Sequence, residues 1–327
     1  MGNKRKIYFR ADAGPEIGYG HYIRSLALAD MLKQDFNCTM FTQSPTEYQL
    51  REAGPICPVV ALPNDDSKFD IFLNQIHGDE IVVLDNYFFT TDYQRAIKAK
   101  GCQLVCIDDL HDRHYVADLI INQAINVSPQ DYSCESYTRF ALGLGYSLLR
   151  KPFFEACAKR EEHLARGKKT FNVVVAFGGS DRFDLTGKVI TSIADIDVIN
   201  RITAIVGDSY ASKMMNKSPK VHYRKNLSAE EIAHLFSISD IAILPASTMM
   251  NEALACGIKI IGGYFVQNQE SDYHAFNMAN MIYGAGDFTE EHAISRIKFL
   301  LNRVSGKDGN TVSSIVPFRY VKLFKSL

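Results

Sequence analysis

One short segment, residues 18–24 (GYGHYIR), places a histidine directly behind two glycines at the start of a predicted helix. Gly18 and Gly20 permit a tight turn and leave room for a ligand close to the backbone. A free imidazole titrates near pH ~6.5, so His21 in the first helical turn could accept a proton near neutral pH. A surface histidine in a helix-capping loop would show the same pattern, and the segment alone leaves both interpretations open.

A second glycine-rich turn, residues 177–181 (FGGSD), follows an apolar strand predicted over residues 171–177 and precedes a predicted helix. Backbone N–H groups exposed at such a turn form an anion site, which suits a diphosphate. We therefore predict that Gly178, Gly179 and Ser180 bind phosphate. An ordinary strand-to-helix turn is the alternative.

Residues 245–252 (PASTMMNE) follow another apolar strand, predicted over residues 241–244. Ser247 or Thr248 can cap the helix that begins here, and their hydroxyl and amide groups could also bind phosphate. One turn further along, the carboxylate of Glu252 could accept both hydroxyls of a ribose. A glutamate that only complements the positive end of the helix explains the same residue on local grounds.

A polar patch, residues 267–271 (QNQES), follows the strand predicted to end near Phe265. The uncharged amides of Asn268 and Gln269 suit the hydroxyl or acetamido groups of a sugar. A polar loop that caps the next helix is the alternative.

Acidic side chains follow two further apolar strands. Asp85 comes directly after the strand predicted over residues 81–84, and an acidic pair, residues 108–109, follows the next strand. His111 and His114 lie close to that pair, but the spacing matches no standard zinc pattern. We therefore predict a solvated turn there and no metal site.

Short apolar strands alternate with amphipathic helical segments, and these elements must position all of the residues above. Near-continuous apolar strands separated by helices indicate a parallel sheet that is covered on both faces. Ligands bind beyond the carboxyl ends of such strands, which is where the polar turns lie. The strands are predicted at residues 6–9, 38–41, 81–84, 104–107, 171–177, 202–206, 241–244 and 259–261.

The pattern of strand, glycine-rich loop and helix occurs twice, which predicts an α/β protein with two doubly wound, Rossmann-like domains facing a cleft. The length of 327 residues agrees with two domains of ~150 residues each. We predict an N-terminal domain over residues 1–150 and a C-terminal domain over residues 151–327, linked by a charged segment that ends near residue 169. A final helix predicted over residues 313–327 can cross back to the first domain.

The composition argues against several classes of protein. Lys and Arg number 36 against 37 Asp and Glu, for a net charge of −1, so the basic excess of a general nucleic-acid binder is missing. No apolar run approaches the ~20 residues that span a bilayer. The 7 cysteines are scattered, which predicts reduced, buried thiols in a cytoplasmic protein.

The standard nucleotide fingerprints are also missing. Ile23 stands where a dinucleotide motif starting at Gly18 needs its third glycine. Arg182 stands where a P-loop with its lysine at Lys188 needs its first glycine. The sequence supports neither a nicotinamide enzyme nor a P-loop NTPase, and we predict no cofactor.

Several of these segments together resemble the nucleotide-sugar hydrolases of pseudaminic acid biosynthesis, which act on UDP-2,4-diacetamido-2,4,6-trideoxy-β-L-altropyranose and are related in fold to MurG-type GT-B glycosyltransferases. Any one segment is a weak signal, but seven blocks in the family's order are specific, and they run through nearly the whole chain. The matching segments are residues 9–13 (FRADA), 17–24 (IGYGHYIR), 84–87 (LDNY) with 108–109 (DD), 143–150 (GLGYSLLR), 177–181 (FGGSD), 246–254 (ASTMMNEAL) and 268–271 (NQES).

The resemblance implies a metal-independent hydrolase that releases UDP by cleaving the anomeric C–O bond, with a small-molecule UDP-sugar as its partner. It implies that His21 is the catalytic group and that Tyr87 and Asn268 line the sugar site. One departure is Pro245, which removes an N–H donor where many relatives have glycine. The UDP side of the family's site matches Gly178, Gly179, Ser247, Thr248 and Glu252.

Cleavage of an anomeric bond builds positive charge on the sugar and negative charge on the leaving diphosphate, which backbone amides and a helix N-terminus can stabilise. Water is a poor nucleophile, so a base is needed near the anomeric carbon, and His21 is the candidate. Asp12 and Asp85 are candidate partners that orient the imidazole or stabilise the sugar cation. Gly18, Gly20, Arg24 and Gln269 complete the predicted substrate-binding set.

Two alternatives remain open at this stage. A GT-B glycosyltransferase would pass the sugar to an acceptor hydroxyl, and a catalytically silent protein would bind the nucleotide-sugar without turnover. A strict requirement for an acceptor would identify the first, and tight binding without turnover the second.

Overall fold

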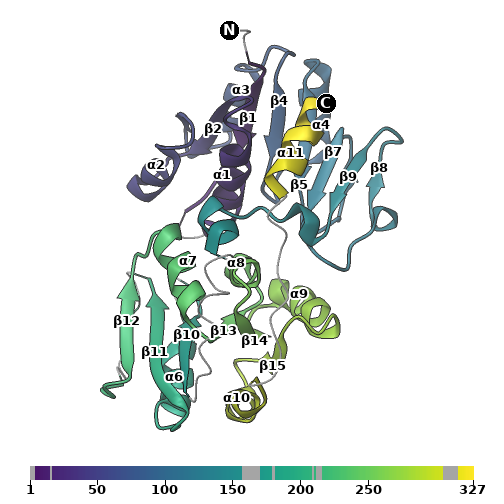
Figure 1. Ribbon diagram of the computed structural model, residues 1–327. Coiled ribbons are helices and arrows are strands. Elements are labelled where there is room, and N and C mark those ends of the chain that lie inside the picture. Colours follow the sequence, from purple (N-terminus) through teal and green to yellow (C-terminus); the bar gives the residue numbers. More distant parts are fainter. Residues whose placement is uncertain are drawn as a thin grey trace. The chain divides into compact units, whose positions relative to one another are not determined.

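The computed structural model describes residues 4–14, 17–156, 170–178, 181–207, 210, 216–304 and 316–327 (Figure 1). The chain divides into two compact units, each with its own parallel sheet. Unit 1 consists of Met1–Lys151 together with Ser314–Leu327, and unit 2 of Pro152–Ser313. No helix in these described ranges is long and apolar enough to cross a bilayer.

The described strands of unit 1 form a seven-stranded parallel sheet in the order β3-β2-β1-β4-β5-β7-β9. The strand order reverses at β1, which pairs with both β2 and β4, and a ligand site is expected beside such a reversal. The strands are β1 (Lys6–Arg10), β2 (Asn37–Gln43), β3 (Val59–Leu62), β4 (Ile81–Leu84), β5 (Gln103–Ile107), β7 (Leu119–Asn122) and β9 (Arg139–Leu142), with a separate pair β6 (His114–Tyr115) and β8 (Ser133–Cys134).

Helices cover both faces of this sheet. All four residues of β4 are buried, because a central strand of a covered parallel sheet contacts helices on each side. The helical elements of unit 1 are α1 (Gly20–Leu32), α2 (Glu47–Ala53), α3 (Ser67–Leu73), α4 (Thr91–Ala99), the short 3-10 turns η1 (Pro129–Asp131) and η2 (Leu144–Tyr146), and α11 (Val316–Lys325).

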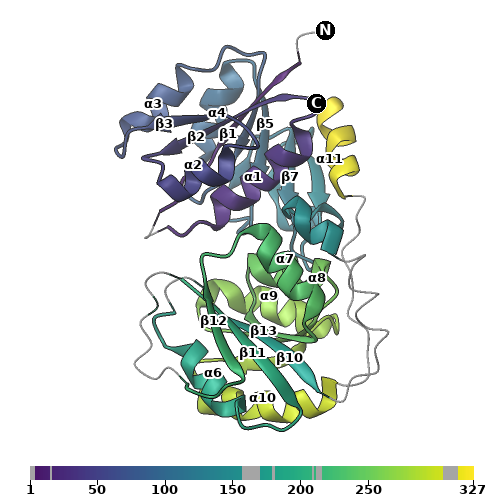
Figure 2. The same cartoon turned by 60° about the vertical axis from the view of Figure 1, so that its left-hand side comes forward.

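The final helix α11 lies beside α1, as Figure 2 shows, although the two are far apart in the sequence. The Tyr320 hydroxyl donates to the Tyr146 carbonyl at 2.5 Å, and the rings of Phe324 and Phe36 meet edge to face. Ten of the residues of α1 are buried, because α1 packs against the sheet and against the neighbouring α11. His21, the catalytic candidate, therefore lies on a helix that packs against two neighbouring elements.

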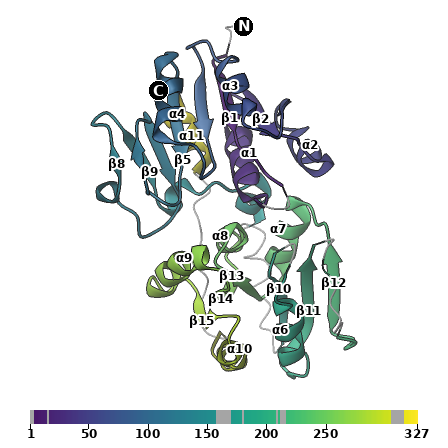
Figure 3. The same ribbon diagram turned by 180° about the vertical axis from the view of Figure 1, so that it is seen from behind.

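Unit 2 repeats the architecture with six described strands in the order β12-β11-β10-β13-β14-β15 (Figure 3). Its core is formed by the inward-facing side chains of these strands and the helices α6 and α10. The strands are β10 (Phe171–Ala176), β11 (Ile199–Val206), β12 (Val221–Lys225), β13 (Ile241–Pro245), β14 (Lys259–Tyr264) and β15 (Tyr283–Asp287). The helices are α6 (Leu185–Ile193), α7 (Ala229–Ile238), α8 (Thr248–Ala255), α9 (Gln267–Met278) and α10 (Glu291–Arg303).

The predicted α/β class with two doubly wound, parallel-sheet halves is confirmed. All eight predicted strands correspond to observed ones, and the predicted final helix corresponds to α11. Most of the predicted linking segment lies outside the described residues.

Candidate active site

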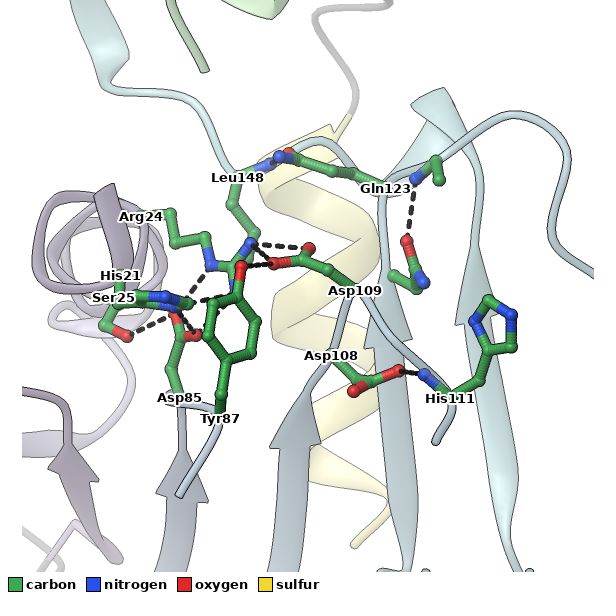
Figure 4. A network of polar contacts seen from close by, with 12 residues as sticks. His21, Arg24, Ser25, Asp85, Tyr87, Asp108, Asp109, His111, Gln123 and Leu148 are labelled. Carbon is green, nitrogen blue, oxygen red and sulfur yellow. Dashed lines mark hydrogen bonds and ion pairs between the residues drawn. The ribbon is translucent and has the colours of Figure 1, made fainter. Parts of the chain in front are cut away.

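The first turn of α1 brings His21 to the carboxyl end of β4, as Figure 4 shows. Its Nδ1 atom lies 2.8 Å from Oδ1 of Asp85, the residue that directly follows β4. Both side chains are buried, with His21 8% and Asp85 1% exposed. The sheet edge and the helix start therefore form an aspartate–histidine pair, and Asp85 is the carboxylate that the fold brings to the imidazole.

The turn before α1 explains how the histidine reaches this place. Gly18 has φ +82°, a conformation that favours glycine, and its N–H and carbonyl pair with those of Gly14 at 2.8 and 3.2 Å. Gly20 is the first residue of α1, and the preceding Tyr19 makes no side-chain cap. The two predicted glycines therefore form the entry to the helix, and both are exposed.

The hydrogen-bond partners of His21 guide the assignment of its tautomer. Burial alone would raise the pKa of Asp85, but the Arg24 guanidinium and the bond from His21 hold it below its usual value. An ionised carboxylate can only accept, so we assign the imidazole proton to Nδ1. Nε2 of His21 then carries the free lone pair and has the form that a general base needs.

Arg24, one turn along α1, donates to two carboxylates at once. Its Nε and Nη2 atoms donate to Asp85 at 2.7 and 2.6 Å, and Nη1 donates to both oxygens of Asp109 at 2.7 and 2.8 Å. The guanidinium is 6% exposed, and although burial lowers its pKa, Asp109 and Asp85 raise it well above the usual value. Ser25 adds a hydroxyl donor to Asp85 at 3.1 Å.

Tyr87 lies against the imidazole and connects to the same network. Its ring meets that of His21 edge to face, with centroids 4.6 Å apart, and its hydroxyl donates to Asp109 at 3.2 Å. Burial and the neighbouring Asp109 raise the pKa of Tyr87, so the hydroxyl stays protonated at neutral pH. The residue is 43% exposed, so part of it is accessible to a ligand.

Asp12, the other candidate partner of the histidine, has different contacts. Its carboxylate is paired with Arg10 through both oxygens, lies 3.3 Å from the Lys68 ammonium and accepts the Gln43 N–H at 2.8 Å. None of the hydrogen bonds in the described part of the chain joins it to His21. Asp12 and Arg10 are both fully buried and form an ion pair at the end of β1, and the bond from the Gln43 N–H connects Asp12 to the end of β2.

The prediction of a solvated turn after β5 is wrong for Asp108. This carboxylate is 9% exposed and accepts the hydroxyls of Tyr115 at 2.5 Å and Tyr132 at 3.1 Å, together with the His111 N–H at 2.8 Å. The nearby His114 has other partners, Ser133 at 2.9 Å and Glu135 at 3.2 Å. Within the described residues no group of His, Cys, Asp or Glu is arranged to hold a metal ion.

A small pocket opens between these groups within unit 1. The end of β4, the end of β5 and the first turns of α1 form its walls. The polar side chains that line it are His21, Arg24, Asp85, Asn86, Tyr87, Gln94, Asp108, Arg113 and Tyr115.

The glycine-rich turn of unit 2 follows β10 as predicted. Gly178 has φ +85°, while Gly179 and Ser180 lie outside the described residues. The Asp181 carboxylate accepts the N–H groups of Leu185 and Thr186, each at 2.8 Å. Asp181 therefore caps the start of α6, a role that the sequence did not indicate.

The turn after β13 leads into α8. Ser247 occupies the N-cap position of the helix, one of the two positions that the sequence allowed, in an extended conformation, and its hydroxyl makes no cap hydrogen bond. Thr248 is the first residue of α8, and both side chains are half-buried. Glu252 is 3% exposed, and on the same helix Asn251 has a buried side-chain oxygen without a hydrogen-bond partner among the described residues.

The polar patch after β14 forms the first turn of α9 instead of a loop. Asn268 is exposed there, while the Gln269 side-chain oxygen accepts the Phe265 N–H at 3.2 Å. Gln269 thus ties the first turn of α9 to the end of the preceding loop, while Asn268 is exposed to solvent.

The sequence comparisons confirm the resemblance drawn from the motifs. The chain is 26% identical over 275 residues to UDP-2,4-diacetamido-2,4,6-trideoxy-beta-L-altropyranose hydrolase of Campylobacter jejuni, with 81% of this chain and 94% of that protein covered. It is 27% identical to an uncharacterized protein of Methanocaldococcus jannaschii, covering 82% of this chain and 57% of that protein. It is 24% identical to spore coat polysaccharide biosynthesis protein SpsG of Bacillus subtilis, covering 81% and 79%. No family model matches the chain.

Comparison with solved structures identifies the fold. MurG of Acinetobacter baumannii aligns with 99% of this chain and 100% of its own at a TM-score of 0.64 and 11% identity. UGT89C1 of Arabidopsis thaliana aligns with 99% and 94% at a TM-score of 0.63 and 11% identity. The fold is that of the GT-B glycosyltransferases. At this identity the match establishes the two Rossmann-like domains and leaves the chemistry to the site itself.

Proposed function

We propose that the protein is a UDP-sugar hydrolase that cleaves the anomeric C–O bond of a UDP-diacetamido-trideoxyhexose and releases UDP and the free sugar for pseudaminic acid biosynthesis. The observation that carries the proposal is the buried pair of His21 and Asp85 at the carboxyl end of β4, in which Asp85 contacts Nδ1 and leaves Nε2 as the proton acceptor that we assign. The similarity to the Campylobacter jejuni hydrolase supplies the substrate class.

In the proposed reaction, His21 Nε2 takes a proton from water as the water oxygen bonds to the anomeric carbon. The C–O bond to the diphosphate breaks, its electron pair leaves with UDP, and Asp85 stabilises the imidazolium that forms. Ordinary glycosidases use two carboxylates for this chemistry. UDP is already a good leaving group, which explains how one base could suffice here.

We assign the nucleotide to unit 2 and the base to unit 1. The turn at Gly178 and the start of α8 at Ser247 and Thr248 supply backbone N–H groups suited to a diphosphate, and Glu252 is assigned to the ribose hydroxyls. Tyr87 and Asn268 are assigned to the sugar, consistent with their exposed side chains.

The reaction is proposed to need no metal, because amides and a helix N-terminus can stabilise the leaving diphosphate. Activity should therefore survive exhaustive chelation. Loss of activity with EDTA and its rescue by Mg²⁺ or Mn²⁺ would contradict this part of the proposal.

The direct test is incubation with a panel of UDP-diacetamido-trideoxyhexoses in ¹⁸O-labelled water, with NMR and mass spectrometry of the products. Cleavage at the anomeric carbon puts the label in the free sugar, whereas attack at phosphorus puts it in UDP. Label in the sugar without any added acceptor supports the proposal. The His21→Asn protein is the matched control for background hydrolysis.

A GT-B glycosyltransferase is the second candidate, because the solved structures that share the fold include MurG and a plant UGT. A transferase would release little UDP from the UDP-sugar alone and would accelerate when an acceptor hydroxyl is added. The same incubation, repeated with a set of acceptor sugars, therefore separates the two functions.

A further inference from the structure

We propose that Arg24 is a positioning residue that keeps the lone pair on Nε2 of His21 at neutral pH. Its charge compensates the charge of Asp85. Its Nη1 atom binds Asp109, which in turn holds Tyr87 against His21. This inference rests on the proposed function in one respect, namely that His21 is the base. It replaces the prediction from sequence that Arg24 contacts the substrate.

The contacts of Arg24 support an internal role. Nε, Nη1 and Nη2 each donate to a protein carboxylate at 2.6 to 2.8 Å, and the side chain is only 6% exposed. Nη2 also lies 3.1 Å from His21 Nδ1, and with the proton on Nδ1 both nitrogens point donors at the same Asp85 oxygen. The guanidinium is thus committed to Asp85 and Asp109 before any ligand arrives.

The charge balance around the imidazole shows why a cation is needed there. Asp85 from the end of β4 and Asp109 from the end of β5 are both tied to the network, and either charge favours the imidazolium form of His21. Arg24 is the cation bonded to both of them. The other groups facing this site are Tyr87 after β4, Asp108 after β5, Arg113 and Tyr115 in the pocket wall, and Tyr320 from α11, which lies near Arg24.

The geometry adds a second effect. Asp109 accepts from Arg24 and from the Tyr87 hydroxyl, so the position of the tyrosine ring depends on the guanidinium. The ring in turn packs edge-on against His21. A change at Arg24 would therefore alter both the charge beside the base and the ring that limits its movement.

The test compares Arg24→Gln with the wild-type protein by NMR of ¹⁵N-histidine-labelled samples across a pH series, with His21→Asn used to assign the His21 signals. We expect the wild-type spectrum to show the Nδ1–H tautomer. In Arg24→Gln the His21 titration midpoint should move up by about one unit or more, because two carboxylates then act without their cation. An unchanged midpoint and tautomer in the folded variant would overturn the proposal.

Kinetics give the second readout. In Arg24→Gln, kcat at pH 7 should fall about tenfold and recover toward the wild-type value at higher pH, while KM stays within a few-fold. A substrate-binding arginine would instead raise KM at every pH, and that result would contradict a positioning role. Arg24→Lys keeps the positive charge, so the acid side of its kcat–pH profile should be close to that of the wild type. Lysine cannot donate to both carboxylates as arginine does, so the position of the Tyr87 ring should be restored only in small part.

Two further variants keep the test decisive. Arg10→Gln removes another buried guanidinium paired with a carboxylate, so it should lower stability without moving the His21 titration. If Arg24→Gln fails to fold, Asp109→Asn removes one negative charge from a partly exposed position, and the His21 midpoint should then move down. No downward shift in that folded variant would also overturn the proposal.

The NMR titration needs no substrate, so it separates the two hypotheses. A wild-type protein that hydrolyses no UDP-sugar but shows the predicted Arg24 effect would contradict the proposed function and support this inference. If the wild-type protein hydrolyses the substrate but the His21 titration is unaffected in Arg24→Gln, the proposed function is supported and this inference is contradicted.

Discussion

The strand ends of unit 1 and unit 2 offer two different surfaces to a ligand. In unit 1 the carboxyl ends of β4 and β5 carry buried charges that are already paired, with His21, Asp85, Arg24 and Asp109 in one network. In unit 2 the corresponding turns offer a backbone with a positive-φ Gly178 and an extended Ser247 whose hydroxyl makes no cap.

This difference matches two different tasks. Proton transfer needs a group of fixed tautomer in a defined electrostatic environment, and a buried network of charges supplies it at a cost in desolvation. Anion binding can use backbone N–H groups at a helix start, which need no charged side chain. We infer that unit 1 is specialised for the base and unit 2 for the nucleotide, and the following predictions test that division.

The largest effect is expected from Asp85→Asn. The substitution breaks the buried ion pair between Asp85 and Arg24 and leaves Arg24 paired with Asp109 alone, so the free energy of unfolding at pH 7 should fall by about 3–5 kcal/mol. Chemical denaturation at several pH values measures this. The pKa of Asp85 is lowered in the folded protein, so its contribution is present above its unfolded value of ~3.9 and is lost as the pH falls through the folded value.

The gap in stability between wild type and Asp85→Asn should therefore narrow in acid, below about pH 4. A gap that stays constant from pH 7 to pH 2 would show that Asp85 is not an ionised partner of Arg24.

His21→Asn is expected to affect turnover and leave nucleotide binding intact. Asparagine keeps the approximate size and a hydrogen-bonding edge toward Asp85 but cannot take a proton near pH 7, so kcat should fall at least ~10²-fold. UDP affinity, measured by calorimetry, should stay within a few-fold because the nucleotide is assigned to unit 2. His77→Asn, on an exposed surface of unit 1, is the matched control. Near-normal kcat in a folded His21→Asn protein would remove His21 from the chemistry.

Glu252→Ala probes the other side of the comparison. If the carboxylate accepts the ribose hydroxyls, UDP binding should weaken by about 1.5–3 kcal/mol, the value of a charge-assisted hydrogen bond. The acid limb of the kcat profile should stay unchanged, because His21 is untouched. Glu252 is 3% exposed, so a thermal melt must confirm folding, and Glu252→Gln provides a milder variant.

Glu230→Ala is the control for Glu252→Ala, since Glu230 is an exposed residue in the first turn of a helix in the same unit. Unchanged UDP affinity in folded Glu252→Ala and Glu252→Gln would remove the carboxylate from the nucleotide site.

The parts of the fold that the sequence predicts are those with a continuous apolar run, such as the IVVL of β4. Such a run was not sufficient, because β3 (VVAL) and β7 (LIIN) have one and were not predicted, and strands without such a run were also missed. The edge strand β12 (VHYRK) carries mostly polar side chains, and β15 (YGAGD) is interrupted by two glycines. An edge strand needs to cover only one face or none, so its composition does not distinguish it from a loop.

The contacts of the candidate site also fall into those that the sequence could predict and those that it could not. The sequence could place Asp85 near His21, because Asp85 follows β4 and His21 follows β1, and these two parallel strands are neighbours in one sheet. The bridge from Arg24 to Asp109 could not be predicted, because the two residues are 85 positions apart and meet only where α1 packs beside the end of β5. The acidic pair at 108–109 was the available signal, and its two members point to different partners, Asp108 to tyrosines and Asp109 to Arg24.

The smallest effect is expected from Pro245→Ala, which asks whether the missing N–H at the end of β13 belongs to the nucleotide site. The Ala246 N–H donates to the Gly263 carbonyl of β14 at 2.8 Å, so the nitrogen of Pro245 faces the β10 side. The pairing of β10 with β13 ends at Val175 and Ile243, before the proline, so no ladder hydrogen bond is lost there.

Alanine at position 245 should therefore lower stability by only ~0.5–1 kcal/mol, through the greater freedom of the unfolded chain, and leave UDP affinity within about twofold. Thermal melts and calorimetry measure the two quantities on the same samples. A several-fold gain in UDP affinity would show instead that the restored N–H reaches the diphosphate. That outcome would add one backbone donor to the nucleotide surface of unit 2.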